Sequence, residues 1–294
     1  EVTTAGQLID RVSGELLAGT VEERNKLASG IDASATSITL TYSLQGVREG
    51  GVFEIGQELF YVWTTNSTSK TAVVERGFGG TTASTHDAGA IVTVNPRFPR
   101  HRVMNQLNAD LADLSSPMNG LFQMKTLDVN YNGSDRMVNL TDTTDIIDLY
   151  DVRLRYLSDD YPVIRSVRLL RDMPTSDFAS GNVLVFDSPV RAGSVRVIYK
   201  APYGQFTAES DTVASVGGTD TLDDLLAIGA QMRLVAPREV KRNFTESQGD
   251  TRRAEEVPSG AVANSMIQLQ RLRRDRIQAE AARLNRQHPI RIRK

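Results

Sequence analysis

The chain of 294 residues contains no cysteine. Disulfide bonds and thiolate zinc sites are therefore excluded, and cysteine usage leaves the redox compartment open. Aromatic residues make up 6% of the chain and charged residues 24%, which is typical of a soluble protein. No apolar run approaches the roughly 18 residues that a spanning helix needs, so we expect no membrane segment. The length allows two domains of roughly 100–200 residues each.

Residues with catalytic or metal-binding potential are also scarce. The chain has three histidines, and none lies at metal-ligand spacing from another histidine. His86 adjoins Asp87, but neighbouring residues point apart on a strand and usually bond locally in a turn. No Gly-x-Ser-x-Gly motif marks a serine nucleophile. We therefore predict that the protein is not an enzyme and needs no metal or cofactor. Carboxylates are abundant, so the sequence does not exclude a catalytic pair of acidic residues. Among them are Asp142, Asp145, Asp148 and Asp151.

Charge is unevenly distributed along the chain. Residues 271–294 contain eight arginines and one lysine against Asp275 and Glu280, a net charge of +7. Because the whole chain carries −2, residues 1–270 carry −9. Such asymmetry indicates a tail that meets an acidic surface, either of protein or of nucleic acid.

The stretch Val73–Phe98 reads as a strand, a long glycine-rich turn, a second strand and an abrupt end. Four glycines lie in the turn among small polar residues, and glycine adopts positive φ without steric strain. Asn95-Pro96 ends the second strand, because proline has no amide hydrogen for a ladder. Gly77–Thr82 lacks the lysine of a phosphate-binding loop, and a strand follows it. We therefore interpret this segment as a hairpin loop.

Alternating and β-branched segments before this turn predict a first β-module over residues 26–96. Its expected strands are Thr36–Tyr42, Val52–Ile55, Glu58–Thr64, Thr71–Glu75 and Ala90–Val94. We expect Trp63, the only tryptophan, to lie in its core. A second β-module is predicted over residues 123–203. Its clearest strands are Met124–Asn130, Met137–Leu140, Ile146–Leu157, Val163–Leu170, Val183–Phe186 and Val195–Tyr199.

Helical periodicity predicts four further elements. They are an N-terminal helix over Thr3–Leu17, a linking helix over Arg102–Leu114, a helix over Thr221–Val235 and a last helix over Gly260–Asn285. Between the last two, the highly charged Arg238–Glu256 predicts a loop.

The predicted fold class is α+β, mainly β. It has two small antiparallel modules, each a barrel or sandwich, with an N-terminal helix, a linking helix and long C-terminal helices. The predicted divisions are residues 1–25, 26–96, 97–122, 123–203, 204–256 (helix and charged loop) and 257–294 (helix and basic arm).

The turn carries a recognisable pattern, Arg-Gly-Phe-Gly-Gly-Thr-Thr-Ala-x-x-His-x-x-Gly-Ala from Arg76, followed by Val-Asn-Pro-Arg-Phe-Pro-Arg. This pattern resembles small β-modules in virion proteins of tailed bacteriophages. The resemblance is greatest to head-to-tail adaptor (connector) proteins of actinobacterial siphophages. At the level of motifs it covers about Thr39–Arg102, and the rest of the chain matches in layout.

This resemblance implies a structural virion protein that forms a ring between portal and tail and continues the DNA channel. It implies a homo-oligomer, a dodecamer, that contacts the portal protein and a tail-side neck or terminator protein. DNA would pass without sequence-specific binding. The expected location is the virion neck, at the head–tail interface, after assembly in the host cytoplasm. Two alternatives stay open: another ring or tip component of the tail or neck, and a nucleic-acid-binding module using the basic C-terminus.

The basic C-terminus is the predicted portal-binding site. Its apolar stripe is narrow, arginine pairs well with carboxylates, and Ile290–Arg293 has strand periodicity. The predicted contact residues are Met266, Leu269, Arg273, Arg274, Arg276, Ile277, Arg283, Leu284, Ile290, Arg291, Ile292, Arg293 and Lys294.

Overall fold

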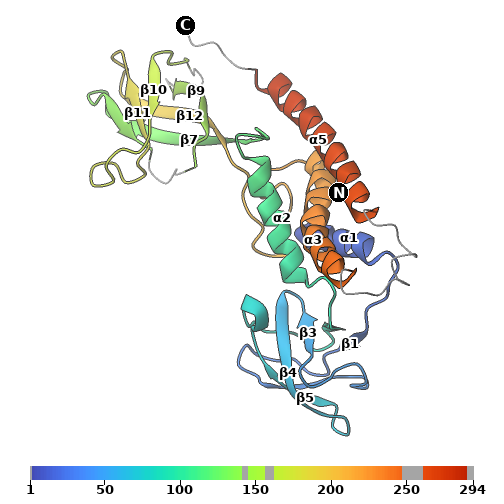
Figure 1. The fold of residues 1–294 in the computed structure, drawn as a ribbon. Helices are drawn as coiled ribbons and strands as arrows, with labels where there is room; N and C mark the ends of the chain where they lie inside the picture. Colours follow the sequence, from blue (N-terminus) through green and yellow to red (C-terminus); the bar gives the residue numbers. More distant parts are fainter. Residues whose placement is uncertain (1, 141–144, 156–161, 247–260, 290–294) are drawn as a thin grey trace. The chain divides into compact units, whose positions relative to one another are not determined.

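The computed structural model describes residues 2–140, 145–155, 162–246 and 261–289 (Figure 1). The fold is mixed α and β, mainly β, as predicted, with one curled antiparallel sheet and two smaller sheets. Among the helices described, none is both long enough and apolar enough to cross a bilayer.

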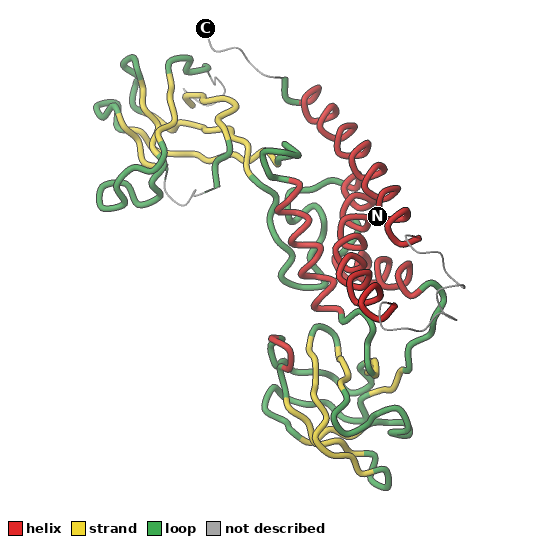
Figure 2. Tube along the Cα trace, in the orientation of Figure 1, coloured by secondary structure: helices red, strands yellow, loops and turns green. Residues whose placement is uncertain are grey.

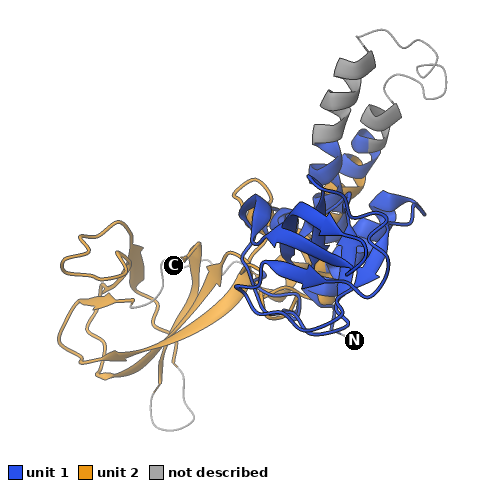
Figure 3. Ribbon diagram, turned by 90° about the horizontal axis from the view of Figure 1, so that it is seen from below, with its two compact units in different colours: residues 1–110, 206–212, 223–270 blue, residues 111–205, 213–222, 271–294 orange. Residues whose placement is uncertain are grey.

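The chain divides into two compact units, and each is built from discontinuous segments (Figure 3). Unit 1 comprises residues 1–110, 206–212 and 223–270. Unit 2 comprises residues 111–205, 213–222 and 271–294. Each unit contains one of the two predicted β regions.

The sheet of unit 1 has six strands in the order β1-β6-β3-β4-β5-β2, and every pairing is antiparallel. Strands are drawn in yellow in Figure 2. The two edge strands also meet just beyond their ends. Leu27 forms a bridge to Leu40, with hydrogen bonds from Ala28 N to Thr39 O (2.9 Å) and from Thr41 N to Lys26 O (2.8 Å). The strands are β1 (Arg24–Lys26), β2 (Ser37–Thr39), β3 (Val52–Ile55), β4 (Glu58–Asn66), β5 (Thr71–Glu75) and β6 (Ile91–Val94).

Two helices of unit 1 pack against one another. Helix α1 (Ala5–Leu17) begins at a capping box, in which Thr4 and Gln7 exchange hydrogen bonds. Its apolar stripe is buried, and Arg11 Nη2 donates to Asp224 Oδ1 (2.8 Å) at the start of α3 (Asp223–Glu246). The helix ends at Leu17, as predicted, and its C-cap residue Ala18 has a left-handed conformation.

Unit 2 contains two three-stranded antiparallel sheets, in the orders β7-β12-β9 and β10-β11-β8. Side chains from both sheets form one hydrophobic core, in which Phe186, Val195 and Val197 are fully or almost fully buried. The strands are β7 (Gln123–Tyr131), β8 (Met137–Asn139), β9 (Asp148–Arg155), β10 (Val167–Leu170), β11 (Val183–Phe186) and β12 (Gly193–Ala201).

The boundary between the units passes through two helices, α2 (Arg100–Leu114) and α5 (Ala261–Gln287). Both agree with the sequence prediction to within two residues at each end. Two short 3-10 helices complete the fold, η1 (Phe78–Gly80) in unit 1 and η2 (Asp220–Leu222) in unit 2.

Two sequence predictions are wrong, and one strand was missed. Trp63 is not a core residue, because 55% of its surface is exposed. The charged segment from Arg238 does not begin a loop, because α3 continues to Glu246, and its arginine, lysine and glutamate are good helix formers. Strand β1 was not predicted, because its three residues are polar and only Asn25 is buried.

Candidate functional site

Helix α5 carries most of the predicted contact residues, and the structure separates them into two groups. Ile277 and Leu284 are buried, and Met266, Leu269 and Arg273 are half-buried. These five follow one another at helical spacing and define the inner face of α5. A partner therefore reaches Ile277 and Leu284 only if α5 first leaves this position.

Polar contacts also hold the inner face of α5 within unit 2. Arg273 Nη2 donates to Asp113 Oδ2 (2.8 Å), and Thr221 Oγ1 donates to the buried Glu280 (3.1 Å). Arg283 donates to Glu280 Oε2 (2.9 Å) and to Thr219 Oγ1 (3.1 Å). The hydrogen bond to Glu280 raises the pKa of Arg283 above its ordinary value. Burial lowers this pKa, but by less.

Arg274 and Arg276 are exposed, as is Arg271 one turn before Arg274. Arg271 and Arg274 offer guanidinium groups to an acidic surface without any change of fold. The predicted contacts Ile290, Arg291, Ile292, Arg293 and Lys294 lie outside the described residues.

The glycine-rich turn is organised by a carboxylate that sequence analysis did not identify. Glu58, at the start of β4, is buried and accepts hydrogen bonds from Arg76 Nε (2.7 Å) and Nη2 (2.9 Å). It also accepts from the backbone N–H groups of Gly77 (3.1 Å) and Ser84 (3.0 Å), and lies 2.9 Å from His86 Nε2. One carboxylate thus binds both ends of the turn.

Arg76 extends this network to the backbone. Its guanidinium donates to the carbonyl oxygens of Asp32, Ala35 and Ser84, and lies over the Phe60 ring at 4.9 Å. Burial raises the pKa of Glu58, but the hydrogen bonds from Arg76, His86 and the backbone outweigh it, so the pKa is lowered. Loop geometry therefore explains the residue types of the turn's pattern: its Arg and His both bind Glu58, and Thr81 Oγ1 accepts from Leu59 N (3.0 Å).

Ser84, His86 and Glu58 have the composition of a catalytic triad but not its geometry. Ser84 Oγ and Glu58 Oε2 both contact the same ring nitrogen, His86 Nε2, at 3.3 and 2.9 Å. In a triad, the acid and the nucleophile bind opposite nitrogens of the imidazole. This arrangement cannot relay a proton from serine, and it serves to hold the turn.

A second polar network surrounds Arg100, the first residue of α2. Its guanidinium donates to Asp10 of α1 (2.5 Å) and to both oxygens of Glu209 (2.8 and 2.6 Å), while Gln57 also donates to Glu209 (2.7 Å). The Arg100 backbone N–H donates to Glu54 (2.9 Å). Glu54 is 5% exposed, and burial raises its pKa to about 7. Asp10, Glu54 and Arg100 line a pocket of about 610 Å³ in unit 1.

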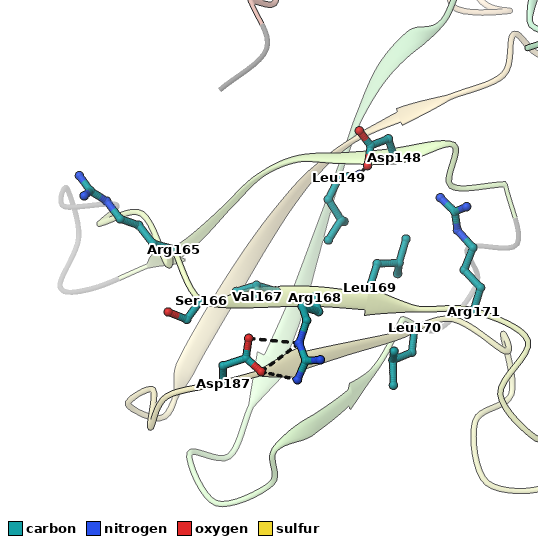
Figure 4. Close-up of a pocket in the computed structure, with 10 residues that line it drawn as sticks. All are labelled: Asp148, Leu149, Arg165, Ser166, Val167, Arg168, Leu169, Leu170, Arg171 and Asp187. Atoms are coloured by element: carbon teal, nitrogen blue, oxygen red, sulfur yellow. Dashed lines mark hydrogen bonds and ion pairs between the residues drawn. The ribbon is translucent and has the colours of Figure 1, made fainter. Parts of the chain in front are cut away.

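Unit 2 has an open groove of about 800 Å³ between β9 and β10 (Figure 4). Leu149 and Leu169 lie in it, and arginines line its rim. Arg168 pairs with Asp187 through Nε (3.0 Å) and Nη2 (2.6 Å), and Arg171 donates to the Ile147 carbonyl. Arg165 lies at one end, with no contact drawn to the other residues of the groove.

Among the described residues, no group of three or more His, Asp or Glu side chains is arranged to hold a metal ion. No protein-family model matches the sequence. A search of curated proteins likewise finds no match.

Proposed function

We propose that the protein is a head-to-tail adaptor of a tailed bacteriophage. Copies of the chain would form a ring, a dodecamer, between the portal protein and a tail-side neck or terminator protein. The ring would continue the DNA channel in the virion neck without sequence-specific contacts to DNA. The observation that carries this proposal is the turn beginning at Arg76, whose sequence resembles β-modules of such proteins.

The geometry of the turn supports a structural function. Arg76, His86 and two backbone N–H groups all bind the buried Glu58, so the patterned residues stabilise the module rather than present a reactive group. A module that is rigid without a ligand suits a component of a permanent assembly.

We further propose that unit 1 contains a small closed barrel and unit 2 a sandwich. The bridge between Leu27 and Leu40, beyond the two edge strands of unit 1, supports closure. The core shared by the two sheets of unit 2 supports a sandwich.

The portal would be bound by the exposed arginines of α5. Arg271 and Arg274 are exposed on the part of α5 that belongs to unit 2, where Arg273 is bound to Asp113, so attachment requires no refolding. Arginine forms forked hydrogen bonds with carboxylates, which gives such a contact orientation as well as affinity.

The test is to mix the purified protein with portal-bearing heads that lack tails, and to locate it by electron microscopy. We expect one ring at the portal vertex. The variant R271E/R274E should attach at least about tenfold more weakly, because opposed charges become like charges. R102E/R155E, which reverses two exposed arginines elsewhere, should attach like wild type.

Binding to tails but not to heads would indicate another neck or tail ring instead. Binding to DNA that falls steeply with added salt, in the absence of head binding, would favour the nucleic-acid-binding module. Equal attachment by R271E/R274E and wild type would show that α5 is not the contact.

A further inference from the structure

Three aromatic side chains form a continuous cluster on β4 and the turn of unit 1. The rings of Tyr61 and Trp63 meet edge to face, with centroids 4.8 Å apart and planes at 74°. Tyr61 also lies against Phe78 of η1, with centroids 5.2 Å apart. Trp63 is 55% exposed, and Tyr61 and Phe78 are half-buried. We call Tyr61, Trp63 and Phe78 the aromatic patch.

The backbone of β4 places Trp63 on the outside. The register between β4 and β5 shifts between Val62 and Thr64, so Trp63 is an extra residue with no partner in the β5 register. Such a bulge re-aims side chains, and here it leaves Val62 buried while Trp63 is exposed. The single tryptophan of the chain is thus exposed to solvent and packs against Tyr61. Exposed tryptophan and tyrosine side chains are enriched at binding surfaces.

Carboxylates flank the aromatic patch. Glu75 of β5 lies directly opposite Tyr61 and is exposed, so it shares the outer side of the sheet with that ring. Glu49 is exposed at the other end, where its Oε1 accepts from Thr65 N (3.2 Å). Aromatic faces with carboxylates beside them attract cations, and the same carboxylates repel the phosphates of nucleic acids.

The C-terminal segment of the chain carries the cationic side chains that such an aromatic patch would bind. Residues 271–294 have a net charge of +7, and Ile290–Lys294 lie beyond α5, outside the described residues. The end of α5 is tied to unit 2, because His288 contacts the rings of Phe122 and Tyr150 at 6.3 and 5.7 Å. In the sequence of this segment, Arg291 and Arg293 alternate with Ile290 and Ile292. Guanidinium stacks on indole better than an ammonium group does.

We propose that the aromatic patch of one copy binds the arm Ile290–Lys294 of a second copy, with an arginine of the arm stacked on Trp63 and paired with Glu75 or Glu49. A chain that carries both a patch and its complement joins copies head to tail, and such contacts generate rings when the rotation closes. This goes beyond the proposed function, because it assigns a contact between copies whether or not the protein binds heads.

The first experiment uses Trp63 as the probe, because its fluorescence is the only tryptophan signal. A chain that ends at Pro289 is titrated with the peptide His-Pro-Ile-Arg-Ile-Arg-Lys. We expect a saturable blue shift, because the guanidinium displaces water from the indole. The peptide with both arginines changed to glutamate should give no shift, and the lysine version should bind about fivefold more weakly.

The second experiment tests association by analytical ultracentrifugation. The variant W63A and the chain ending at Pro289 should each self-associate at least about tenfold more weakly than wild type. Mixed in equal amounts they should form a dimer, because one supplies the arm and the other the patch. Y42A removes a side chain that is 56% exposed outside the patch, and should associate like wild type. E75K supplies a second patch variant should W63A alter the fold.

The proposal fails if the mixture does not associate, or if the chain ending at Pro289 self-associates like wild type. It also fails if the fluorescence of the full chain is blue-shifted independently of concentration, since the arm would then bind its own patch. A blue shift with oligo(dT) but not with the peptide would assign the patch to nucleic acid instead.

Discussion

The Nε2 atom of His86 lies 2.9 Å from the buried Oε2 of Glu58, although 28 positions separate the two residues in the sequence. The contact joins the end of the glycine-rich turn to the start of β4. Arg76 binds the same carboxylate, so the turn is fixed at both ends by one side chain. A substitution of Glu58 would therefore disturb both ends of the turn at once.

Glu58→Gln should lower the free energy of unfolding by about 3 kcal/mol. The substitution leaves the guanidinium of Arg76, whose side chain is 7% exposed, without its buried counter-charge. Urea denaturation followed by circular dichroism measures the change. Asp87→Asn alters an exposed carboxylate in the same turn and should stay within about 0.5 kcal/mol of wild type. A loss below 1 kcal/mol for Glu58→Gln would show that Glu58 does not organise the turn.

Stability should depend on pH through Glu54. Its pKa is raised from 4.5 to about 7 by burial, so the folded state keeps the proton over a range in which the unfolded chain releases it. The contribution of Glu54 to the free energy of unfolding is therefore fully present below pH 4.5 and is lost as the pH rises to about 7. The full effect is about 3 kcal/mol.

Glu54→Gln, which keeps an acceptor for the Arg100 amide, should remove this effect. The variant should gain stability relative to wild type at pH 8 and show no gain at pH 4. Thermal unfolding at the two pH values measures the difference. An equal gain in stability at pH 4 and pH 8 would mean that packing, and not ionisation of Glu54, causes the effect.

Two glycines of the turn allow backbone strain and steric clash to be separated. Gly77 has φ +63°, and a Cβ there would lie 2.8 Å from the Thr81 carbonyl oxygen. Gly89 has φ +84° with open space around it. Gly89→Ala should cost about 1 kcal/mol of unfolding free energy from the left-handed conformation alone, and Gly77→Ala should cost clearly more. Equal midpoints in urea would mean that the turn relaxes around the added methyl group.

Leucines on opposite sides of α5 test whether the helix belongs to the fold. Leu284 is 7% exposed and Leu272 is 45% exposed. Leu284→Ala should destabilise the protein by about 2–4 kcal/mol, because it empties a buried site, and Leu272→Ala by less than about 1 kcal/mol. If neither substitution changes the unfolding midpoint, α5 does not pack as described and its apolar stripe becomes available to a partner.

Local patterns predicted most of the elements because periodicity and turn residues act within a few positions. Among the described residues, every strand except β1 and each of the four α-helices overlaps a segment predicted as such, and β3, β5 and β11 have the predicted bounds. What the sequence could not reveal is which distant groups meet. Glu58 reads as an ordinary first residue of a strand, and only folding brings it to Arg76 and His86.

The same reason explains the errors at the candidate sites. Trp63 was predicted to lie in the core, but a one-residue bulge opposite β5, which depends on strand pairing, leaves it exposed. The apolar stripe of α5 was too sparse to indicate a core helix. Its inner face is completed by Arg273 and Glu280, whose partners Asp113 and Thr221 come from distant segments.

The discontinuous composition of unit 1 constrains how the chain can be made. The apolar residues of α1 are synthesised long before α3, which packs on α1 and begins only at Asp223. Until α3 is synthesised, Leu8, Ile9 and Val12 lack the helix that packs on them, and all of β7–β12 is made in the meantime. A fragment that stops before residue 206 would expose this surface permanently, so nascent chains of that length should require a chaperone and recombinant fragments should aggregate.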